Sequence, residues 1–369
     1  MRITRCETAH FRLPREVWWP VALEDRTLAI ESIELITCEI ETDTGVRGGG
    51  YTYTLGRGGA GVHGLLSEAA SMLVGQQLRT ASGIWERLDR SFQRVGHAGV
   101  VSLALAAADI ALWDALAVEA GVPLYRLIGA ERESVPAYGS SIDLGYSRDK
   151  LVATVREHVE RGLEAVKVKV GRAVGEDLER LAAVRAAIGS DRRLMVDANL
   201  GWSLADAARR ARLMEEFDLT WLEEPLHPED VDGHVRLQGG TSIAIALGET
   251  LFSIDEFRRY IEAGAVRYVQ ADAARLGGIT PFLRVAELAH AAHLTLAPHF
   301  VQDVHVHLLC AVPNGEILEH LPLLDAVLEH PLPIAADGTV SPPDRPGTGV
   351  SFRRDLLAPH RVARSELRA

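Results

Sequence analysis

The stretch AVKVKVG, residues 165–171, places two lysines one residue apart inside a run of valines. In an extended strand, side chains two residues apart share a face, so Lys167 and Lys169 point to one side and the valines to the other. Each ammonium group lowers the pKa of its neighbour, and a lysine shifted in this way can act as a neutral base near pH 7. This stretch alone leaves open an alternative, an edge strand with two solvated lysines.

Short apolar strands of this kind recur from about residue 135, and amphipathic helical stretches such as GEDLERLAAVRAAIG (175–189) and LADAARRARLMEEF (204–217) lie between them. Eight strands are expected, at VPAYGSS (135–141), AVKVKVG (165–171), LMVDAN (194–199), TWLEEP (220–225), IAIALGE (243–249), YVQAD (268–272), LTLAPH (294–299) and GEILE (315–319). Eight alternating strands and helices predict an α/β fold, a parallel (β/α)8 barrel of the TIM type.

The chain ahead of the barrel has a different pattern. SIELITCEIETDTGVRGGGYTY (32–53) alternates apolar and polar residues around a Thr-Asp-Thr-Gly turn, which predicts a hairpin. Residues 99–121 are apolar on all sides, which predicts a buried helix ended by Gly121 and Pro123. We therefore expect an α+β capping domain over 1–130, the catalytic barrel over 131–320, and a Pro/Gly-rich segment over 321–369 that packs back on the capping domain.

Composition limits the classes of partner. The 369 residues are 47% hydrophobic and carry a formal net charge of −12, which argues against nucleic acid as a partner. The N-terminal residues lack the apolar core of a signal peptide, and no run of 18 apolar residues occurs, so we expect a cytoplasmic protein that does not bind a membrane. Three cysteines far apart in the sequence predict no disulfide framework. A small molecule is the expected ligand.

A polar residue stands at or near the C-terminal end of one predicted strand after another, and these residues follow one another at about the length of one strand-plus-helix unit. The set is Lys169, Asp197, Glu223, Glu249, Asp272, His299 and Glu319. Residues at the C-terminal ends of barrel strands converge on one mouth, where the active sites of such barrels lie. The sequence therefore predicts one polar site built from these side chains.

Three consecutive members of this set are carboxylates, Asp197, Glu223 and Glu249. They would repel one another in a partly desolvated mouth, and a divalent cation removes that repulsion. Oxygen ligands favour Mg²⁺ over zinc, and Mn²⁺ shares the same ligands. Asn199 shares the strand face of Asp197 and either orients a ligand or caps the next turn.

Asp272 and His299 are expected on neighbouring strands. A carboxylate bound to one ring nitrogen fixes the imidazole tautomer and leaves the other nitrogen as an acid or base. His305 and His307 begin a helix at a spacing that suits packing better than metal binding, and we assign them no chemistry.

These motifs resemble the enolase superfamily, and in particular its mandelate racemase-like subgroup. The similarity covers KVK, VDAN, EEP, GE, DAARLGG with PHF, and ILE, and it spans nearly the whole chain. GGITPF, LAPHFVQDVHVHL and PDRPGTGVSF are most similar to acid-sugar dehydratases, especially those that act on galactarate and talarate. Ala271 departs from the pattern, since many relatives have proline before the dyad aspartate.

The resemblance implies Mg²⁺-dependent removal of the proton next to a carboxylate, with Lys169 and His299 on opposite sides of the substrate. Lys167 would lower the pKa of Lys169, and a protonated Glu319 would donate a hydrogen bond to the substrate. Loss of a β-hydroxyl then gives a 2-keto-3-deoxy acid from an aldonate or aldarate. Return of the proton to the other face would make the protein a racemase or epimerase. A Schiff-base aldolase and a silent metal-dependent sugar-acid binder are the remaining alternatives.

The resemblance also places a substrate lid in the capping domain, in loops near 15–26 and 51–60. Arg15, Trp19, Tyr51 and Arg57 are the candidate substrate-binding residues there, although exposed arginines are common without a function. The resemblance further implies a homo-oligomer, from dimer to octamer.

Overall fold

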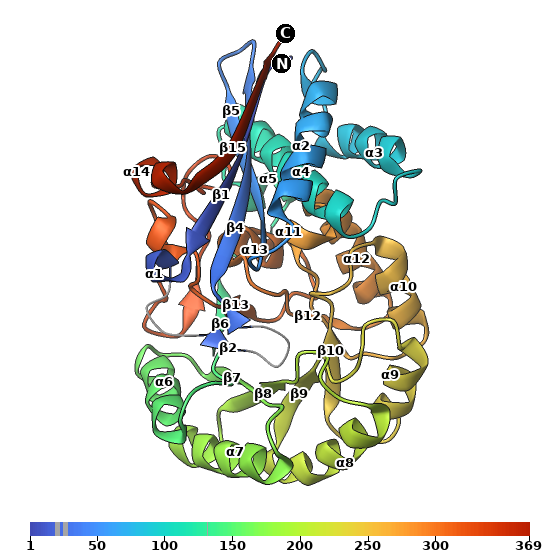
Figure 1. Ribbon diagram of the computed structural model, residues 1–369, viewed down its shortest axis with the longest axis vertical. Coiled ribbons are helices and arrows are strands. Elements are labelled where there is room, and N and C mark those ends of the chain that lie inside the picture. The colour runs from blue at the N-terminus through green and yellow to red at the C-terminus, as the bar shows by residue number, and fades with distance from the viewer. Residues whose placement is uncertain (19–22, 25–28, 131) are drawn as a thin grey trace.

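The computed structural model describes residues 1–18, 23–24, 29–130 and 132–369. Its strands form a four-stranded antiparallel sheet, a curled parallel sheet and a two-stranded pair. In Figure 1 the four-stranded sheet and helices α2–α4 lie above the ring of the parallel sheet and its outer helices. The fold class is the one predicted from the sequence.

The upper sheet has the order β15-β1-β4-β5. Its strands are β1 (Ile3–Pro14), β4 (Ser32–Thr42), β5 (Arg47–Thr54) and β15 (Arg361–Arg368). The helices beside it are α2 (Gly59–Leu73), α3 (Ala81–Phe92), α4 (Val100–Ala120) and α5 (Leu124–Ile128). The predicted hairpin is confirmed as β4 and β5, joined through a turn in which Gly45 has a φ of +80°. The chain therefore returns to its first strand after completing the barrel.

Helix α4 forms the core of this upper layer, as predicted. Among the described residues it alone has the length and hydropathy of a membrane-crossing helix, but 72% of that apolar stretch is buried inside the protein. Strand β5 lies so close to α4 that a Cβ on Gly48 would come within 2.3 Å of the Ala111 carbonyl oxygen, and one on Gly50 within 2.2 Å of that of Ala107. The glycines of β5 thus allow the sheet to contact the helix backbone.

The parallel sheet contains the eight predicted strands. They are β6 (Val135–Ser140), β7 (Ala165–Lys169), β8 (Arg193–Asp197), β9 (Leu219–Glu223), β10 (Ala244–Leu247), β11 (Tyr268–Val269), β12 (Thr295–Leu296) and β13 (Leu318–His320). β13 pairs with β6, and the backbone of Leu296 in β12 exchanges hydrogen bonds of 2.9 and 3.0 Å with Asn314 and Glu316 just ahead of β13. These bonds close the ring.

Helices cover the outside of the barrel. They are α6 (Arg148–Glu160), α7 (Val174–Ile188), α8 (Leu204–Met214), α9 (Val231–Gln238), α10 (Ile254–Glu262), α11 (Ala273–Leu276), α12 (Ile279–Ala291) and α13 (Gln302–Ala311). Ser147, Ser203 and Ser253 cap α6, α8 and α10, each accepting a hydrogen bond from a backbone N–H in the first turn. These caps set where each helix begins, just beyond the loops that carry the polar residues.

Apolar side chains fill the barrel beneath its polar end. They form one buried cluster of Tyr138, Ala165, Met195, Trp221, Ala246, Ala297 and Ile317. The valines of β7 belong to the larger core cluster that includes residues of α6 and α7. Lys167 and Lys169 are both buried, so the alternative of a solvated edge strand is wrong.

The remaining elements are short. They are α1 (Arg15–Trp18), β2 (Leu23–Glu24), β3 (Ala29–Ile30), β14 (Thr339–Val340), α14 (Arg354–Leu357) and three 3₁₀ turns (Glu215–Phe217, Asp325–Val327, Ala358–His360). The loop expected from residue 51 is corrected, because β5 continues to Thr54 and only residues 55–58 precede α2. Cys6 and Cys38, remote in sequence, are neighbouring buried free thiols whose sulfurs are 3.7 Å apart.

Two buried aspartates of α4 join the upper layer to the rest of the chain. Asp109 accepts hydrogen bonds from the backbone N–H (2.8 Å) and hydroxyl (2.7 Å) of Thr280 at the start of α12. Asp114 accepts from the backbone of Gly49 in β5 (2.8 Å) and of Thr348 (2.6 Å) in the C-terminal segment. Burial raises the pKa of Asp109 to about 7.

We predict that Asp109 makes the protein less stable as the pH rises. Its ordinary pKa is near 4, so the raised value favours folding below pH 4, and this contribution is lost as the pH rises through 7. The asparagine of Asp109→Asn stays neutral at every pH. Between pH 5 and pH 8 the unaltered protein should therefore lose about 2 to 3 kcal/mol more of its free energy of unfolding than Asp109→Asn loses. Urea titration at both pH values measures this. Glu119→Gln, at an exposed position of α4, is the control, and an equal pH dependence in all three proteins would contradict the prediction.

Candidate active site

The parallel strands bring the predicted polar residues together at one end of the barrel. β7 carries both lysines, Asp197 ends β8, Glu223 ends β9 and Glu319 lies in β13. Glu249, Asp272 and His299 follow β10, β11 and β12 within three residues of each strand. Parallel strands point their C-terminal ends the same way, so one mouth collects side chains that are far apart in the sequence.

Asp197, Glu223 and Glu249 form a compact oxygen cluster. One carboxylate oxygen from each lies within 4.8 Å of the others, and the first two side chains are almost fully buried. Oxygen ligands at this spacing, with room for further oxygens from water or substrate, suit Mg²⁺. Asn199 lies at the same place, since its backbone N–H donates to Asp197 at 2.9 Å and its side-chain amide at 3.3 Å.

Each lysine of β7 binds carboxylates of the cluster. Lys167 Nζ lies 2.7 Å from Glu223 and 2.8 Å from Glu319. Lys169 Nζ contacts Asp197, and its backbone N–H donates to Asp143 at 3.0 Å. The two ammonium groups thus have separate partners, that of Lys169 on the neighbouring strand β8 and those of Lys167 on β9 and β13, which do not adjoin β7.

The pKa of Lys169 is raised overall, although Lys167 acts on it in the expected direction. Burial and the charge of Lys167 do act to lower this pKa, but Asp197 and the other carboxylates outweigh them. A cation held by Asp197 would compete with Lys169 for that carboxylate and weaken this effect. The net charge around Lys169, rather than its lysine neighbour alone, therefore sets its basicity.

Glu319 is ionised in this arrangement, which corrects the expectation of a protonated donor. Burial acts to raise its pKa, but Lys167 and His299 lower it to about 2. One oxygen binds Lys167, and the other accepts a hydrogen bond from the backbone N–H of Phe300 at 2.7 Å. By contrast, burial raises the pKa of Glu223 to about 7, despite the ion pair with Lys167.

His299 pairs with Asp272 as predicted. Its Nδ1 lies 3.0 Å from Asp272 Oδ2, and its Nε2 lies 2.9 Å from Glu249, a contact that the sequence did not predict. Although burial acts to lower the pKa of His299, the two carboxylates raise it to about 10. The ring therefore donates on both sides in this state.

Five further residues at this end were not predicted as site residues. Tyr53 donates to Asp272 at 2.7 Å, and Gln270 donates to Glu223 at 2.6 Å. Asp143 accepts a hydrogen bond from the backbone N–H of Lys169, and Arg275 lies over the Tyr53 ring at 5.9 Å. Glu224 is buried, and burial raises its pKa well above the ordinary value. Glu224 and Gln270 lie one and two residues from predicted residues, in EEP and QAD. Tyr53 lies in the 51–60 stretch expected as a lid, where only Tyr51 and Arg57 are predicted to bind substrate.

Three of the predicted lid residues, Arg15, Tyr51 and Arg57, lie in the part of the chain that the structure describes. Tyr51 is buried in β5, and its hydroxyl donates to Asp303. Arg15 lies 3.8 Å from Glu16 and 4.0 Å from Glu31, and Arg57 is exposed. Within the described part of the chain, none of these three forms an ion pair or hydrogen bond with a strand-end residue. Trp19 lies outside the described residues.

His305 and His307 make hydrogen bonds to the backbone. His305 accepts from Ala273 at 3.0 Å through Nε2 and donates to the Phe300 carbonyl at 2.8 Å through Nδ1. Burial lowers its pKa to about 4, so the ring is neutral. His305 thereby ties together the segments that carry Asp272 and His299.

The chain is similar to known proteins in sequence and in fold. Residues 150–356 match the family model "Enolase C-terminal domain-like", and residues 9–129 match "Mandelate racemase / muconate lactonizing enzyme, N-terminal domain". An L-talarate/galactarate dehydratase of Salmonella typhimurium is 38% identical over 89% of this chain and 83% of its own. A 3,6-anhydro-alpha-L-galactonate cycloisomerase of Streptomyces coelicolor is 37% identical over 94% and 96%.

Solved structures agree with these sequence relatives. The Salmonella typhimurium dehydratase with Mg and L-lyxarohydroxamate superposes with a TM-score of 0.94 at 35% identity, covering 100% of this chain and 95% of its own. An L-talarate dehydratase of Polaromonas sp. JS666, complexed with Mg and L-glucarate, gives 0.93 at 35% identity, covering 100% and 99%.

The oxygen cluster is expected to bind Mg²⁺ and so to stabilise the protein. Free Mg²⁺ at about 100 times its Kd should add about 3 kcal/mol to the free energy of unfolding. Glu249→Gln removes one charged ligand and should weaken binding at least about 10-fold, as isothermal titration calorimetry and thermal unfolding would report. Asp206→Asn on the exposed surface of α8 is the control. The assignment is wrong if the unaltered protein gains nothing from Mg²⁺ or if the Glu249 variant gains as much.

Proposed function

The chain belongs to the mandelate racemase and muconate lactonizing enzyme family of the enolase superfamily, and on this premise we propose that it is a magnesium-dependent acid-sugar dehydratase. The observation that carries the proposal is the position of the oxygen cluster between two candidate bases. Lys169 contacts the cluster at Asp197, and His299 contacts it at Glu249. A carboxylate substrate bound at the cluster would have a proton-transfer group on either side.

Asp197, Glu223 and Glu249 are the proposed metal ligands. Mg²⁺, when bound, would accept the negative charge that develops on the substrate carboxylate as its neighbouring proton leaves. Lys167 lies beside two carboxylates and would add positive charge to the same region. Glu319 keeps Lys167 in place through its ion pair, and that is the role we propose for it.

Proton removal is assigned to Lys169 or His299, according to the side on which the proton lies. The C–H electron pair forms a carbon–carbon double bond toward the β-carbon as the β-hydroxyl leaves. The protonated member of the pair gives its proton to this hydroxide, so water departs. The enol that remains tautomerises to a 2-keto-3-deoxy acid. Asp272 holds Nδ1 of His299, which leaves Nε2 for these transfers.

The relatives support an aldonate or aldarate as the substrate. Three relatives that are 34% to 38% identical are named for talarate, galactarate and related sugar acids. Several polar side chains at the mouth, including Asn199, would suit hydroxyl groups next to the reacting carbon.

A second candidate uses the same first step with another leaving group. Two relatives, at 37% and 34% identity, are named cycloisomerases of an anhydro-galactonate and of a galactarolactone. In such substrates a ring oxygen would leave in place of hydroxide, and the product would keep every atom.

Without a leaving group, the same pair would act as a racemase or epimerase. A non-catalytic sugar-acid binder is the remote alternative. Such a protein should lack a metal ligand, a base or an acid, whereas this chain has a suitable residue at each of the proposed metal-binding and proton-transfer positions.

The wider setting is also a proposal. We take residues 1–130 as a capping domain, 131–320 as the catalytic barrel and 321–369 as the returning segment. The free, buried cysteines support a reducing compartment such as the cytoplasm. We propose a homo-oligomer that binds neither nucleic acid nor membrane.

The purified protein with Mg²⁺ should release 2-keto-3-deoxy acid from at least one acid sugar. A panel of mono- and diacid sugars, with products detected as semicarbazones, measures this. Lys169→Ala and His299→Asn should each lower the rate by about 100-fold or more, and EDTA should abolish turnover until Mg²⁺ is restored.

Lys150→Ala and His293→Asn are matched surface controls, and asparagine suits the positive φ of His293. If no keto acid forms, the same panel in D₂O distinguishes the alternatives by NMR. Exchange of the proton without elimination would point to a racemase or epimerase, and rearrangement of an anhydro sugar or lactone would point to a cycloisomerase. Absence of every reaction would reject catalysis on this panel.

A further inference from the structure

We propose that Tyr53, in the upper sheet, is a positioning residue for the His299 side of the reaction and leaves the Lys169 side unaffected. The inference rests on the proposed function for its chemistry. It adds a residue from outside the barrel to the Asp272–His299 pair.

Tyr53 and His299 both contact the same carboxylate oxygen of Asp272. The Tyr53 hydroxyl donates to Asp272 Oδ2 at 2.7 Å, and His299 Nδ1 lies 3.0 Å from the same oxygen. The Tyr53 oxygen is also 3.3 Å from Nδ1. The other carboxylate oxygen, Oδ1, accepts from the backbone N–H of Ala274 at 2.8 Å. With both oxygens held, the carboxylate plane is fixed, and this plane orients the imidazole that donates to it.

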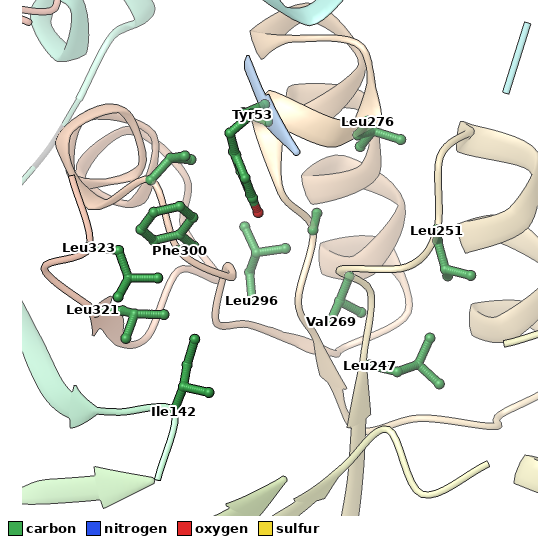
Figure 2. Close-up of a cluster of buried hydrophobic side chains, with 14 of the residues drawn as sticks. Tyr53, Ile142, Leu247, Leu251, Val269, Leu276, Leu296, Phe300, Leu321 and Leu323 are labelled. Atoms are coloured by element: carbon green, nitrogen blue, oxygen red, sulfur yellow. The ribbon is translucent and has the colours of Figure 1, made fainter. Parts of the chain in front are cut away.

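Tyr53 itself is held firmly. It is 2% exposed, and its ring packs edge-on against Phe300 with the centroids 4.8 Å apart. Figure 2 shows it among buried leucine side chains of the barrel, with its ring beside Phe300. The preceding residue, Thr52, donates to the Ala274 carbonyl at 2.6 Å. Strand β5 therefore makes two hydrogen bonds to this segment, one to Asp272 and one to Ala274. A hydroxyl placed in this way has little freedom to follow Asp272 if the aspartate moves.

The effect should be confined to one side of the site. Lys169 is held by Asp197 and, through its backbone, by Asp143. Neither of these residues bonds to Tyr53 in the described part of the chain. Loss of the Tyr53 hydroxyl therefore removes one of the bonds that orient Asp272 and, through it, the imidazole, and leaves the contacts of Lys169 unchanged.

Strand β5 offers a matched control. Tyr51 lies two residues before Tyr53 on the same face, is 1% exposed, and donates to Asp303 at 2.8 Å. Its ring packs edge-on against Phe352 with the centroids 5.3 Å apart. Tyr51→Phe and Tyr53→Phe thus remove the same atom from the same strand and break the same kind of bond. A loss due only to a weakened strand would appear in both variants.

The experiment measures exchange of the α-proton with D₂O by NMR, with Mg²⁺ present. Galactarate and L-talarate are the probes, because they differ in configuration at a carbon next to a carboxylate. Lys169→Ala and His299→Asn identify which protein group serves each probe. Tyr53→Phe should slow exchange by about 10- to 100-fold where His299 is required, and by less than about twofold where Lys169 is required. Tyr51→Phe, which breaks a bond to Asp303 instead of Asp272, should slow both probes to the same extent, so that only Tyr53→Phe distinguishes the two sides.

A second readout does not depend on turnover. The ring nitrogen signals of His299 in ¹⁵N-histidine-labelled protein, assigned by their loss in His299→Asn, should shift in Tyr53→Phe and stay in place in Tyr51→Phe. If the unaltered protein exchanges neither probe, the proposed function fails for these aldarates, while the ring signals still test Tyr53. Equal slowing on both sides, no slowing, or unshifted signals would overturn the positioning role.

Discussion

The repulsion among five carboxylates, four of them buried and Glu249 partly buried, is the constraint to which the rest of the barrel mouth responds. Asp197, Glu223, Glu249, Asp272 and Glu319 each have a basic partner, supplied by Lys167, Lys169 or His299. A buried charge without a partner would cost several kcal/mol, so these three bases stabilise the folded barrel mouth. The same three are the groups that the proposed reaction uses. A cation that enters the oxygen cluster takes over part of their structural task and leaves them available for chemistry.

Much of this site follows from periodicity, and the parts that do not follow are contacts between distant segments. The unit length of the barrel and the alternation of side chains along a strand place Lys169, Asp197 and His299 at one mouth, whatever the details of packing. Whether the pKa of Lys169 is raised or lowered depends on whether Asp197 or Lys167 lies closer to its ammonium group, and these distances are known only from the folded structure. Tyr53 belongs to another sheet, and no repeat relates that sheet to the barrel. The prediction of Arg15 and Arg57 as lid residues rests on the family resemblance of their segments and on their charge, and neither of these fixes where a side chain points.

The upper layer, formed by the four-stranded sheet and helix α4, is hydrogen-bonded to the barrel and to the C-terminal segment. Asp109 and Asp114 of α4 satisfy backbone N–H groups of α12, β5 and the C-terminal segment, and Tyr53 reaches the Asp272–His299 pair. These are directional bonds in buried surroundings, where a misplaced partner leaves a polar group unsatisfied. The two layers are therefore held in one relative position, and a change of packing in the sheet would be felt at the imidazole.

The pairing of β15 with β1 has a consequence for synthesis on the ribosome. Strand β1 is made first, but its partner at residues 361–368 emerges only after the whole barrel. Throughout that interval one edge of β1 exposes unpaired backbone groups, the usual template for association between chains. The strand carries Arg5 and Glu7 along this stretch, and in the finished fold they pair with Glu366 and Arg364 of β15. The charged side chains that later form ion pairs with β15 thus disfavour association of β1 with other chains until β15 has been synthesised.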